Sequence, residues 1–162
     1  MYKMTSLQIR GFRRLRQMDL EMRPLMVLIG ANGVGKTSVL DAFSLLSASA
    51  AGRLNSKLSG MGGISDILTI NQSQEVCMSI DMEVPGYEPL KYDLHIAPKG
   101  TSYNIPSEKL FQSRTDDPGP FMHIDSHYGD IKYYEIDERK LLRPTWDHNP
   151  METYLSQVPK MF

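Results

Sequence analysis

The chain lacks several features that would place it in a specialised class. It has one cysteine, Cys77, which excludes an internal disulfide and suits a reducing compartment, where it is most simply a small buried residue of a strand. No apolar run approaches the roughly 20 residues that a membrane-spanning helix needs. The first residues, Met1–Thr5, lack the apolar stretch of a signal peptide. We therefore expect a cytoplasmic protein without a membrane partner.

An excess of charge of one sign is also lacking. The chain has 18 Lys and Arg against 19 Asp and Glu, so its net charge is −1 and no overall attraction to nucleic acid is expected. The distribution is uneven, with arginines gathered before residue 30 and acidic residues in the last third. With 162 residues, 41% of them hydrophobic, residues 1–162 are predicted to form a single domain with a substantial core.

A glycine-rich segment is the most informative feature that is present. It reads Gly30-Ala31-Asn32-Gly33-Val34-Gly35-Lys36-Thr37, a complete Walker A pattern G-x-x-x-x-G-K-[ST], and Ser38 follows. Glycines let such a loop wrap its backbone N–H groups around phosphate oxygens. Lys36 supplies a point charge for the β and γ phosphates, and the Thr37 hydroxyl is a ligand for Mg²⁺. The sequence therefore predicts that the chain binds a nucleoside triphosphate with magnesium.

The residues on either side of the loop predict the elements that it needs. Leu25–Ile29 is continuously apolar, which predicts a buried central strand, and Pro24 marks its entry. Ser38–Ser49 has apolar residues at helical spacing, so a helix is expected to direct its N-terminal dipole at the same anion. Thr5–Arg10 and Arg14–Leu20 are predicted to precede the loop strand as two antiparallel strands.

The second half of the chain has the alternation of an antiparallel sheet. Val76–Val84, Leu90–Ile96 and Ser102–Ile105 alternate with a period of two, with turns at Pro85-Gly86 and Pro98–Gly100. The fold class predicted from both halves is α/β or α+β, a P-loop NTPase with a mixed sheet around a buried loop strand and an antiparallel meander subsheet.

Three further segments have weaker patterns. Ile131–Ile136 is the last strand candidate. Residues 51–63 are rich in Gly and Ser and are predicted to form a mobile loop. Residues 141–162 contain three prolines and are predicted to form an irregular tail, in which Met151–Val158 is the only short helix candidate.

Two stretches resemble the N-terminal lobe of ABC-class ATPase heads, in particular the RecF, SMC and OLD-like predicted AAA-type ATPases. They are Leu7-Gln8-Ile9-Arg10-Gly11-Phe12-Arg13, similar to the opening strand and turn of those heads, and Gly30–Ser38, similar to their G-x-N-G-x-G-K-[ST]-[ST]. The resemblance implies ATP and Mg²⁺ as cofactors, and Arg13 or Arg14 as an additional phosphate or base contact. It also implies that ATP is sandwiched between two heads, so the expected partner is a second copy or a missing C-terminal half.

Hydrolysis in such heads also needs a signature segment like L-S-G-G-Q and a Walker B pair of carboxylates. Leu58–Gly63 looks like a signature, but it precedes the meander and is predicted to be an unrelated flexible loop. Asp137 and Glu138 are the only Walker B candidates, although Lys132 and Glu135 favour a plain antiparallel strand with a solvated acidic end. We therefore expect the chain alone to bind ATP with little turnover, whereas the resemblance implies ATP hydrolysis at the level of the family.

Several other polar residues are candidates without a defining motif. Gln72, Gln74 and Gln112 are all available as the glutamine that senses the γ phosphate in such heads. His123-Ile124-Asp125-Ser126-His127 would place two imidazoles and a carboxylate on one face if extended, but the surrounding Pro and Gly residues favour a polar turn. His148 invites comparison with the switch histidine of those heads and is more simply a turn residue.

Two other functions stay open at this point. A small P-loop kinase would transfer a phosphoryl group, but such kinases usually begin with the loop strand, whereas here two strands precede it. A GTPase is disfavoured because no N-K-x-D segment occurs. A non-hydrolysing head, in which ATP controls dimerisation or DNA contact, agrees with the basic N-terminal edge, but this edge lacks interleaved aromatic residues.

Overall fold

The computed structural model describes residues 3–70, 73–114, 119–135 and 139–158. They form an eight-stranded sheet in the order β2-β1-β3-β4-β5-β6-β7-β8, and every neighbouring pair is antiparallel. The strands are β1 Lys3–Phe12, β2 Leu15–Glu21, β3 Val76–Glu83, β4 Leu90–Lys99, β5 Ser102–Gln112, β6 Phe121–His127, β7 Asp130–Glu135 and β8 Lys140–Leu142. The helices are α1 Lys36–Ala50, α2 Leu54–Gly60, α3 Ile64–Ile67 and the 3-10 helix η1 Tyr154–Ser156.

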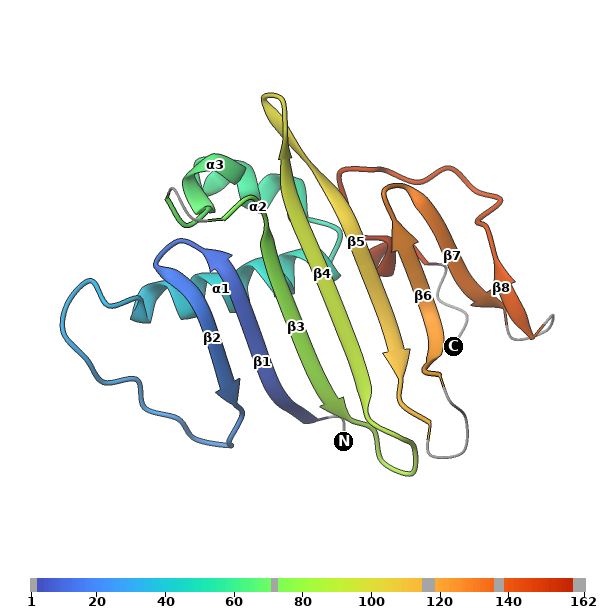
Figure 1. The fold of residues 1–162 in the computed structure, drawn as a ribbon, viewed down its shortest axis with the longest axis horizontal. Helices are drawn as coiled ribbons and strands as arrows, with labels where there is room; N and C mark the ends of the chain where they lie inside the picture. Colours follow the sequence, from blue (N-terminus) through green and yellow to red (C-terminus); the bar gives the residue numbers. More distant parts are fainter. Residues whose placement is uncertain (1–2, 71–72, 115–118, 136–138, 159–162) are drawn as a thin grey trace.

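The sheet has one covered face and one open face. On β3, Val76 and Met78 are buried while Cys77 and Ser79 between them are partly exposed, as the alternation in the sequence predicts. Figure 1 shows α1, α2 and α3 on the far side of the sheet, with the strands toward the viewer. The apolar side chains of β1, β3 and β4 therefore form the main core with these helices.

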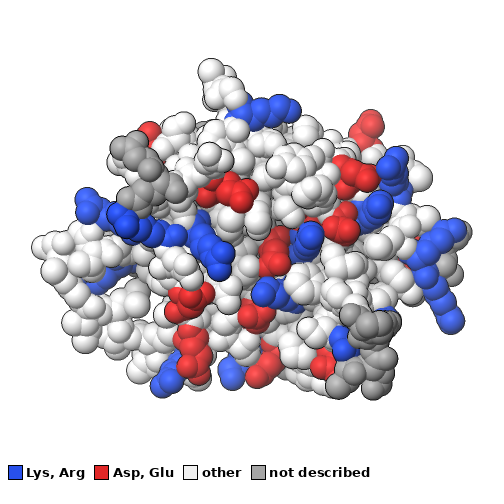
Figure 2. Space-filling view, in the orientation of Figure 1, with Lys and Arg blue, Asp and Glu red and all other residues white. Residues whose placement is uncertain are grey.

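The open face has a mixed charge. In Figure 2 the Lys and Arg side chains interleave with Asp and Glu side chains across the middle of the sheet. This face therefore presents both signs of charge side by side, as the small net charge of the chain suggests.

No helix among the described residues has both the length and the hydropathy needed to cross a bilayer.

The predicted buried strand at Leu25–Ile29 is wrong for this structure. These residues form no strand, and Leu25 and Ile29 are 82% and 90% exposed. An apolar run becomes a strand only where another strand satisfies its backbone N–H and C=O groups, and none of the described strands pairs with these residues. The sheet is accordingly antiparallel throughout and not mixed. The predictions of two strands before the loop and of a helix after it are confirmed by β1, β2 and α1.

The predicted mobile loop at residues 51–63 is also wrong in its central part. Residues 54–60 form α2, in which Leu54 and Leu58 lie one turn apart and are both buried against the core. The stretch that looks like a signature, Leu58–Gly63, is therefore the end of this helix together with its cap, where Gly62 and Gly63 have positive φ angles.

The polar turn predicted around residues 123–127 is instead part of strand β6. Ile124 and Ser126 are buried, while His123 and Asp125 are partly exposed. Ile124 lies opposite Leu110 of β5, and this pairing outweighs the polar character of the segment. β7 covers most of the predicted strand at residues 131–136, of which Ile136 lies outside the described residues.

Residues 149–158, which we call the C-terminal strap, are mostly irregular, and η1 lies within them. The irregular tail predicted for residues 141–162 is wrong at its start, where Leu141 and Leu142 belong to β8, and residues 159–162 lie outside the described residues. The strap is attached to the sheet by the buried carboxylate of Glu108 on β5. This carboxylate accepts hydrogen bonds from the N–H groups of Tyr154 (2.6 Å) and Leu155 (2.8 Å) and from the Tyr92 hydroxyl (3.0 Å). Burial raises the pKa of Glu108, and the three donors oppose that shift.

The strap is also attached to the helices. The Thr153 hydroxyl donates to the Ser49 carbonyl in the last turn of α1, at 2.7 Å. The Glu152 carboxylate accepts from the N–H groups of Leu54 (2.7 Å) and Asn55 (3.2 Å) in the first turn of α2. The strap therefore joins the helical layer to β5.

Gly11 of β1 lies where the chain cannot accept a side chain. Its φ is +72°, and a Cβ there would lie 2.3 Å from the Glu75 carbonyl oxygen. We expect Gly11→Ala to lower the free energy of unfolding by about 3 kcal/mol, because left-handed strain and a backbone clash add. The matched control is Gly100→Ala, where φ is +60° with open space around it, so only about 1 kcal/mol is expected. Urea unfolding measures both, and equal losses would show that the contact with Glu75 is unimportant.

Candidate functional site

The glycine-rich loop lies at the β2 edge of the sheet, next to the beginning of that strand. The chain leaves β2, runs through residues 22–35 without strand or helix, and enters α1 at Lys36 (Figure 1). Gly33 and Gly35 have φ angles of +82° and +108°, which side chains rarely permit. A Cβ on Gly35 would also lie 3.1 Å from a methyl carbon of Leu15. Both glycines are therefore required for the shape of the loop.

The N-terminus of α1 carries no cap from a side chain. Gly35 is the N-cap residue, makes no side-chain hydrogen bond, and no acidic residue lies in the first turn. The first N–H groups of a helix have no partner within it, and they carry the positive end of the helix dipole. With 15 residues, α1 is long enough for this effect to be substantial. The arrangement suits a negatively charged ligand.

Lys36 adds a full positive charge at the same place. Its ammonium group donates to the carbonyls of Gly30 and Ala31, in the latter case at 2.8 Å, so its side chain folds back over the loop. Thr37 is exposed, whereas Ser38 is buried. The Thr37 hydroxyl is thus accessible as a metal ligand, while the backbone of Ser38 belongs to the first turn of the helix.

The structure separates the two arginines that the sequence leaves as alternatives. The Arg13 side chain forms an ion pair with Asp41 of α1. The backbone N–H of Arg13 donates to the Ile67 carbonyl at 2.6 Å. Arg14 instead extends toward the loop. Its guanidinium group lies close to Gly33, since a Cβ built on that glycine would be 3.6 Å from a guanidinium nitrogen of Arg14. Arg14 is therefore the arginine adjacent to the loop, and Arg13 joins the turn after β1 to α1.

A groove of about 450 Å³ lies between β2 and the loop. Its wall includes Arg14, Leu28, Ile29, Lys36 and Val39. This size falls in the usual range for small-molecule sites, and the groove combines apolar side chains with three cationic ones, Arg14, Arg16 and Lys36. It could hold a ligand with a flat apolar part and an anionic part.

The carboxylates proposed for Walker B, Asp137 and Glu138, lie outside the described residues. The strand before them, β7, is antiparallel to both neighbours and is six strands from β2. At about 4.8 Å per strand, this separation is about 29 Å across the sheet. β7 is therefore the plain antiparallel strand that its charged residues predict, and it does not adjoin the loop.

The remaining polar candidates are dispersed. Gln112 at the end of β5 donates to the Glu88 carbonyl at 2.8 Å, and its amide oxygen lies 2.9 Å from His123 Nε2. Gln74 is exposed, and Gln72 lies outside the described residues. The His148 ring makes an edge contact with Tyr154. Neither Gln112 nor His148 is among the residues that line the groove beside the loop.

One cluster of side chains with metal-ligand chemistry was not predicted from the sequence. Cys77 is half-buried and not the fully buried residue that was expected, and it lies beside His95 of β4 and Glu75. Burial, together with the Glu75 carboxylate, raises the pKa of the Cys77 thiol to about 12. The alternation places Glu75 and Cys77 on one face, but the approach of His95 depends on the register between β3 and β4, which the sequence does not specify.

Comparison with known proteins assigns the chain to a family of ATPases. The chain belongs to the AAA ATPase domain family, which matches residues 2–148. An ATP-binding, ATPase-type function follows from this membership. In addition, 40 residues, 25% of this chain, are 45% identical to the OLD nuclease of Thermus scotoductus (strain ATCC 700910 / SA-01). The matched part is 8% of the length of that nuclease.

Proposed function

We propose that this chain binds the phosphates of ATP and the accompanying Mg²⁺ through Gly30–Ser38. The observation that carries the proposal is the N-terminus of α1, which has no side-chain cap and follows directly on the glycine-rich loop. The Lys36 ammonium group lies over the same loop. In this proposal backbone N–H groups bind the phosphate oxygens, Lys36 neutralises the β and γ phosphates, and the Thr37 hydroxyl ligates Mg²⁺. The family membership of the chain supports ATP as the nucleotide.

We further propose that the chain is one part of a larger ATPase site. The apolar run Leu25–Ile29 supports this, because four of its five residues are exposed and Met26 is half-buried. Such a run next to a nucleotide loop suits a strand that pairs with segments outside this chain. The second part would be a C-terminal half or a second copy, and it would supply the signature segment and the Walker B carboxylates. The mixed charge of the open face in Figure 2 offers no continuous basic surface for DNA, so a DNA contact would use the basic N-terminal edge.

Steady-state kinetics of the purified chain test this proposal. We expect MgATP to bind in a one-to-one complex, while phosphate release stays close to the rate without protein. Steady hydrolysis that Lys36→Ala abolishes would contradict the claim that the site is incomplete. Phosphoryl transfer from ATP to small alcohols in a substrate screen would instead favour a kinase.

Arg14 is expected to contribute to ATP affinity through its guanidinium group. We expect Arg14→Ala to weaken ATP binding about fivefold to tenfold, because one charge-assisted contact at an accessible site is lost. Arg13→Ala is the comparison, since Arg13 is engaged with Asp41. It should leave the affinity unchanged and lower the free energy of unfolding by about 1 kcal/mol, as for a partly exposed ion pair. Isothermal titration calorimetry and thermal unfolding measure the two effects, and the reverse pattern would show that the two roles are exchanged.

A further inference from the structure

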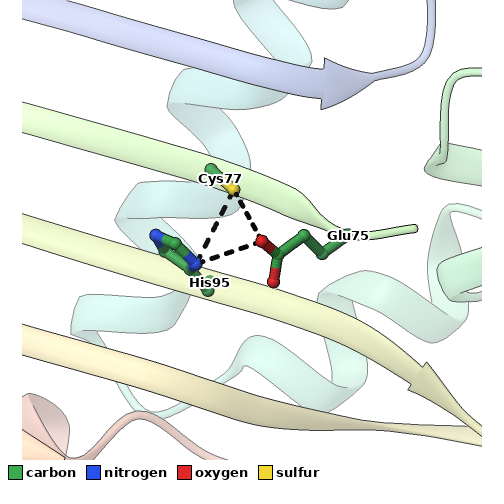
Figure 3. Close-up of side chains that lie close together, drawn as sticks. All are labelled: Glu75, Cys77 and His95. Atoms are coloured by element: carbon green, nitrogen blue, oxygen red, sulfur yellow. Dashed lines mark hydrogen bonds and ion pairs between the residues drawn. The ribbon is translucent and has the colours of Figure 1, made fainter. Parts of the chain in front are cut away.

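The open face of the sheet carries three side chains of different chemistry that converge on one point. They are Glu75, which directly precedes β3, Cys77 on β3 and His95 on β4. Figure 3 shows that the carboxylate, the thiol and the imidazole point toward one another across the two strands. The main core and α1 lie on the other side of the sheet, so this cluster is separate from the glycine-rich loop.

The register of the sheet brings the three together. Cys77 and His95 are directly opposite each other in the β3–β4 pair, so their side chains are cross-strand neighbours on one face. Glu75 is two residues before Cys77, and alternation along the chain places it on the same face. The cluster therefore follows from strand pairing and does not depend on a flexible loop.

The distances between the donor atoms match those of a tetrahedral metal site. Cys77 Sγ lies 3.5 Å from Glu75 Oε1 and 3.7 Å from His95 Nδ1, and the last two atoms are 3.4 Å apart. With a Zn–S bond of about 2.3 Å and Zn–N and Zn–O bonds of about 2.0 Å, a tetrahedral zinc ion sets its ligand atoms about 3.3 to 3.6 Å apart. The three atoms thus define three corners of such a site with little rearrangement.

We propose that Glu75, Cys77 and His95 form a zinc-binding site with three protein ligands and a fourth position open to solvent. Thiolate, imidazole and carboxylate together favour zinc over magnesium or calcium, which prefer oxygen ligands alone. The side chains of His95 and Glu75 are 35% and 40% exposed, so an ion can enter from solvent. Binding converts the Cys77 thiol to a thiolate and releases its proton to solvent.

The charged neighbours of the cluster are compatible with a divalent cation. A bound Zn²⁺ would be balanced by the Glu75 carboxylate and the Cys77 thiolate. Arg10 of β1 pairs with Cys77 on the side away from His95. Asp93 lies two residues before His95 on the same face, where it accepts a hydrogen bond from Ser79. A zinc ion here would cross-link the beginning of β3 to β4.

Cobalt(II) substitution provides a specific test, because the chain has one cysteine. Metal-stripped protein is titrated with Co²⁺, and a thiolate-to-cobalt charge-transfer band in the near ultraviolet reports coordination by Cys77. We expect this band at one metal per chain, its loss on addition of Zn²⁺, and a rise in the melting temperature with either ion. The band should be absent in Cys77→Ser. In His95→Gln and in Glu75→Gln, Co²⁺ affinity should fall by about tenfold or more.

Two control variants separate the site from other metal ligands. His123→Gln on β6 and Lys36→Ala in the loop should leave the band and its midpoint unchanged, and circular dichroism verifies that each variant is folded. Absence of the band at saturating Co²⁺ would overturn the proposal. A band that persists unchanged in His95→Gln and Glu75→Gln would also overturn it, as would a stoichiometry of one metal per two chains, which indicates a bridge between cysteines of two copies.

Discussion

Lys36→Ala lowers the affinity for MgATP by about a hundredfold, equivalent to about 2.7 kcal/mol, if the loop binds triphosphate as proposed. The ammonium is the full positive charge that the loop itself contributes, and it lies over the carbonyls of Gly30 and Ala31. Its loss leaves backbone N–H groups and the helix dipole to bind a highly charged ligand. Calorimetric titration with MgATP measures the effect.

The matched control for this variant is Lys91→Ala, a lysine of β4. It removes the same charge from the chain without approaching the loop, so the affinity for MgATP should not change. The free energy of unfolding of Lys36→Ala should differ from that of the parent by less than about 1 kcal/mol, because its hydrogen bonds are exposed to solvent. Unchanged affinity in a folded Lys36→Ala variant would show that nucleotide binds elsewhere.

The second large effect is expected at Glu108. We expect Glu108→Ala to lower the free energy of unfolding by about 4 kcal/mol, because the buried N–H group of Tyr154, the half-buried N–H group of Leu155 and the buried Tyr92 hydroxyl all lose their acceptor. Urea unfolding measures the loss of stability. Limited proteolysis should in addition show faster cleavage within residues 149–158, since the strap loses its attachment to β5.

Two milder variants identify the source of this effect. Tyr92→Phe removes one of the three donors and should cost about 1 kcal/mol. Glu108→Gln keeps one carbonyl oxygen as an acceptor but turns an NH₂ group toward one of the donors. We therefore expect its loss of unfolding free energy to lie between those of Tyr92→Phe and Glu108→Ala. If Glu108→Ala and Glu108→Gln destabilise equally and neither changes proteolysis of the strap, the carboxylate does not hold the strap.

Strands with strict alternation could be predicted from the sequence, because the alternation within a single strand is enough to assign its buried and its exposed face. β3 and β4 are clear examples, and their facing residues match the expected pattern. The run Leu25–Ile29 has the composition of a buried strand, but a strand is a property of a pair, and the described part of the chain supplies no partner. β6 was missed for the opposite reason, since its polar residues obscure the alternation that buries Ile124 and Ser126.

The candidate sites were predictable to different degrees. The glycine-rich loop is contiguous, so its residues and their chemistry can be recognised without knowledge of the fold. Arg14 could not be chosen over Arg13 from the sequence, because the choice depends on the contact between Arg13 and Asp41 of α1. The cluster of Glu75, Cys77 and His95 needs the cross-strand register, which arises from the pairing of whole strands.

The position of the C-terminal strap has a consequence for the order in which the chain acquires its structure during synthesis. The contacts of Thr153 with Ser49 and of Glu152 with Leu54 span 104 and 98 residues. The last turn of α1 and the first turn of α2 thus leave the ribosome long before the residues that bind them. Contacts of such long sequence separation form slowly, because a long loop must close first. The strap can therefore add its hydrogen bonds to the helical layer only after residues 152 and 153 have been synthesised.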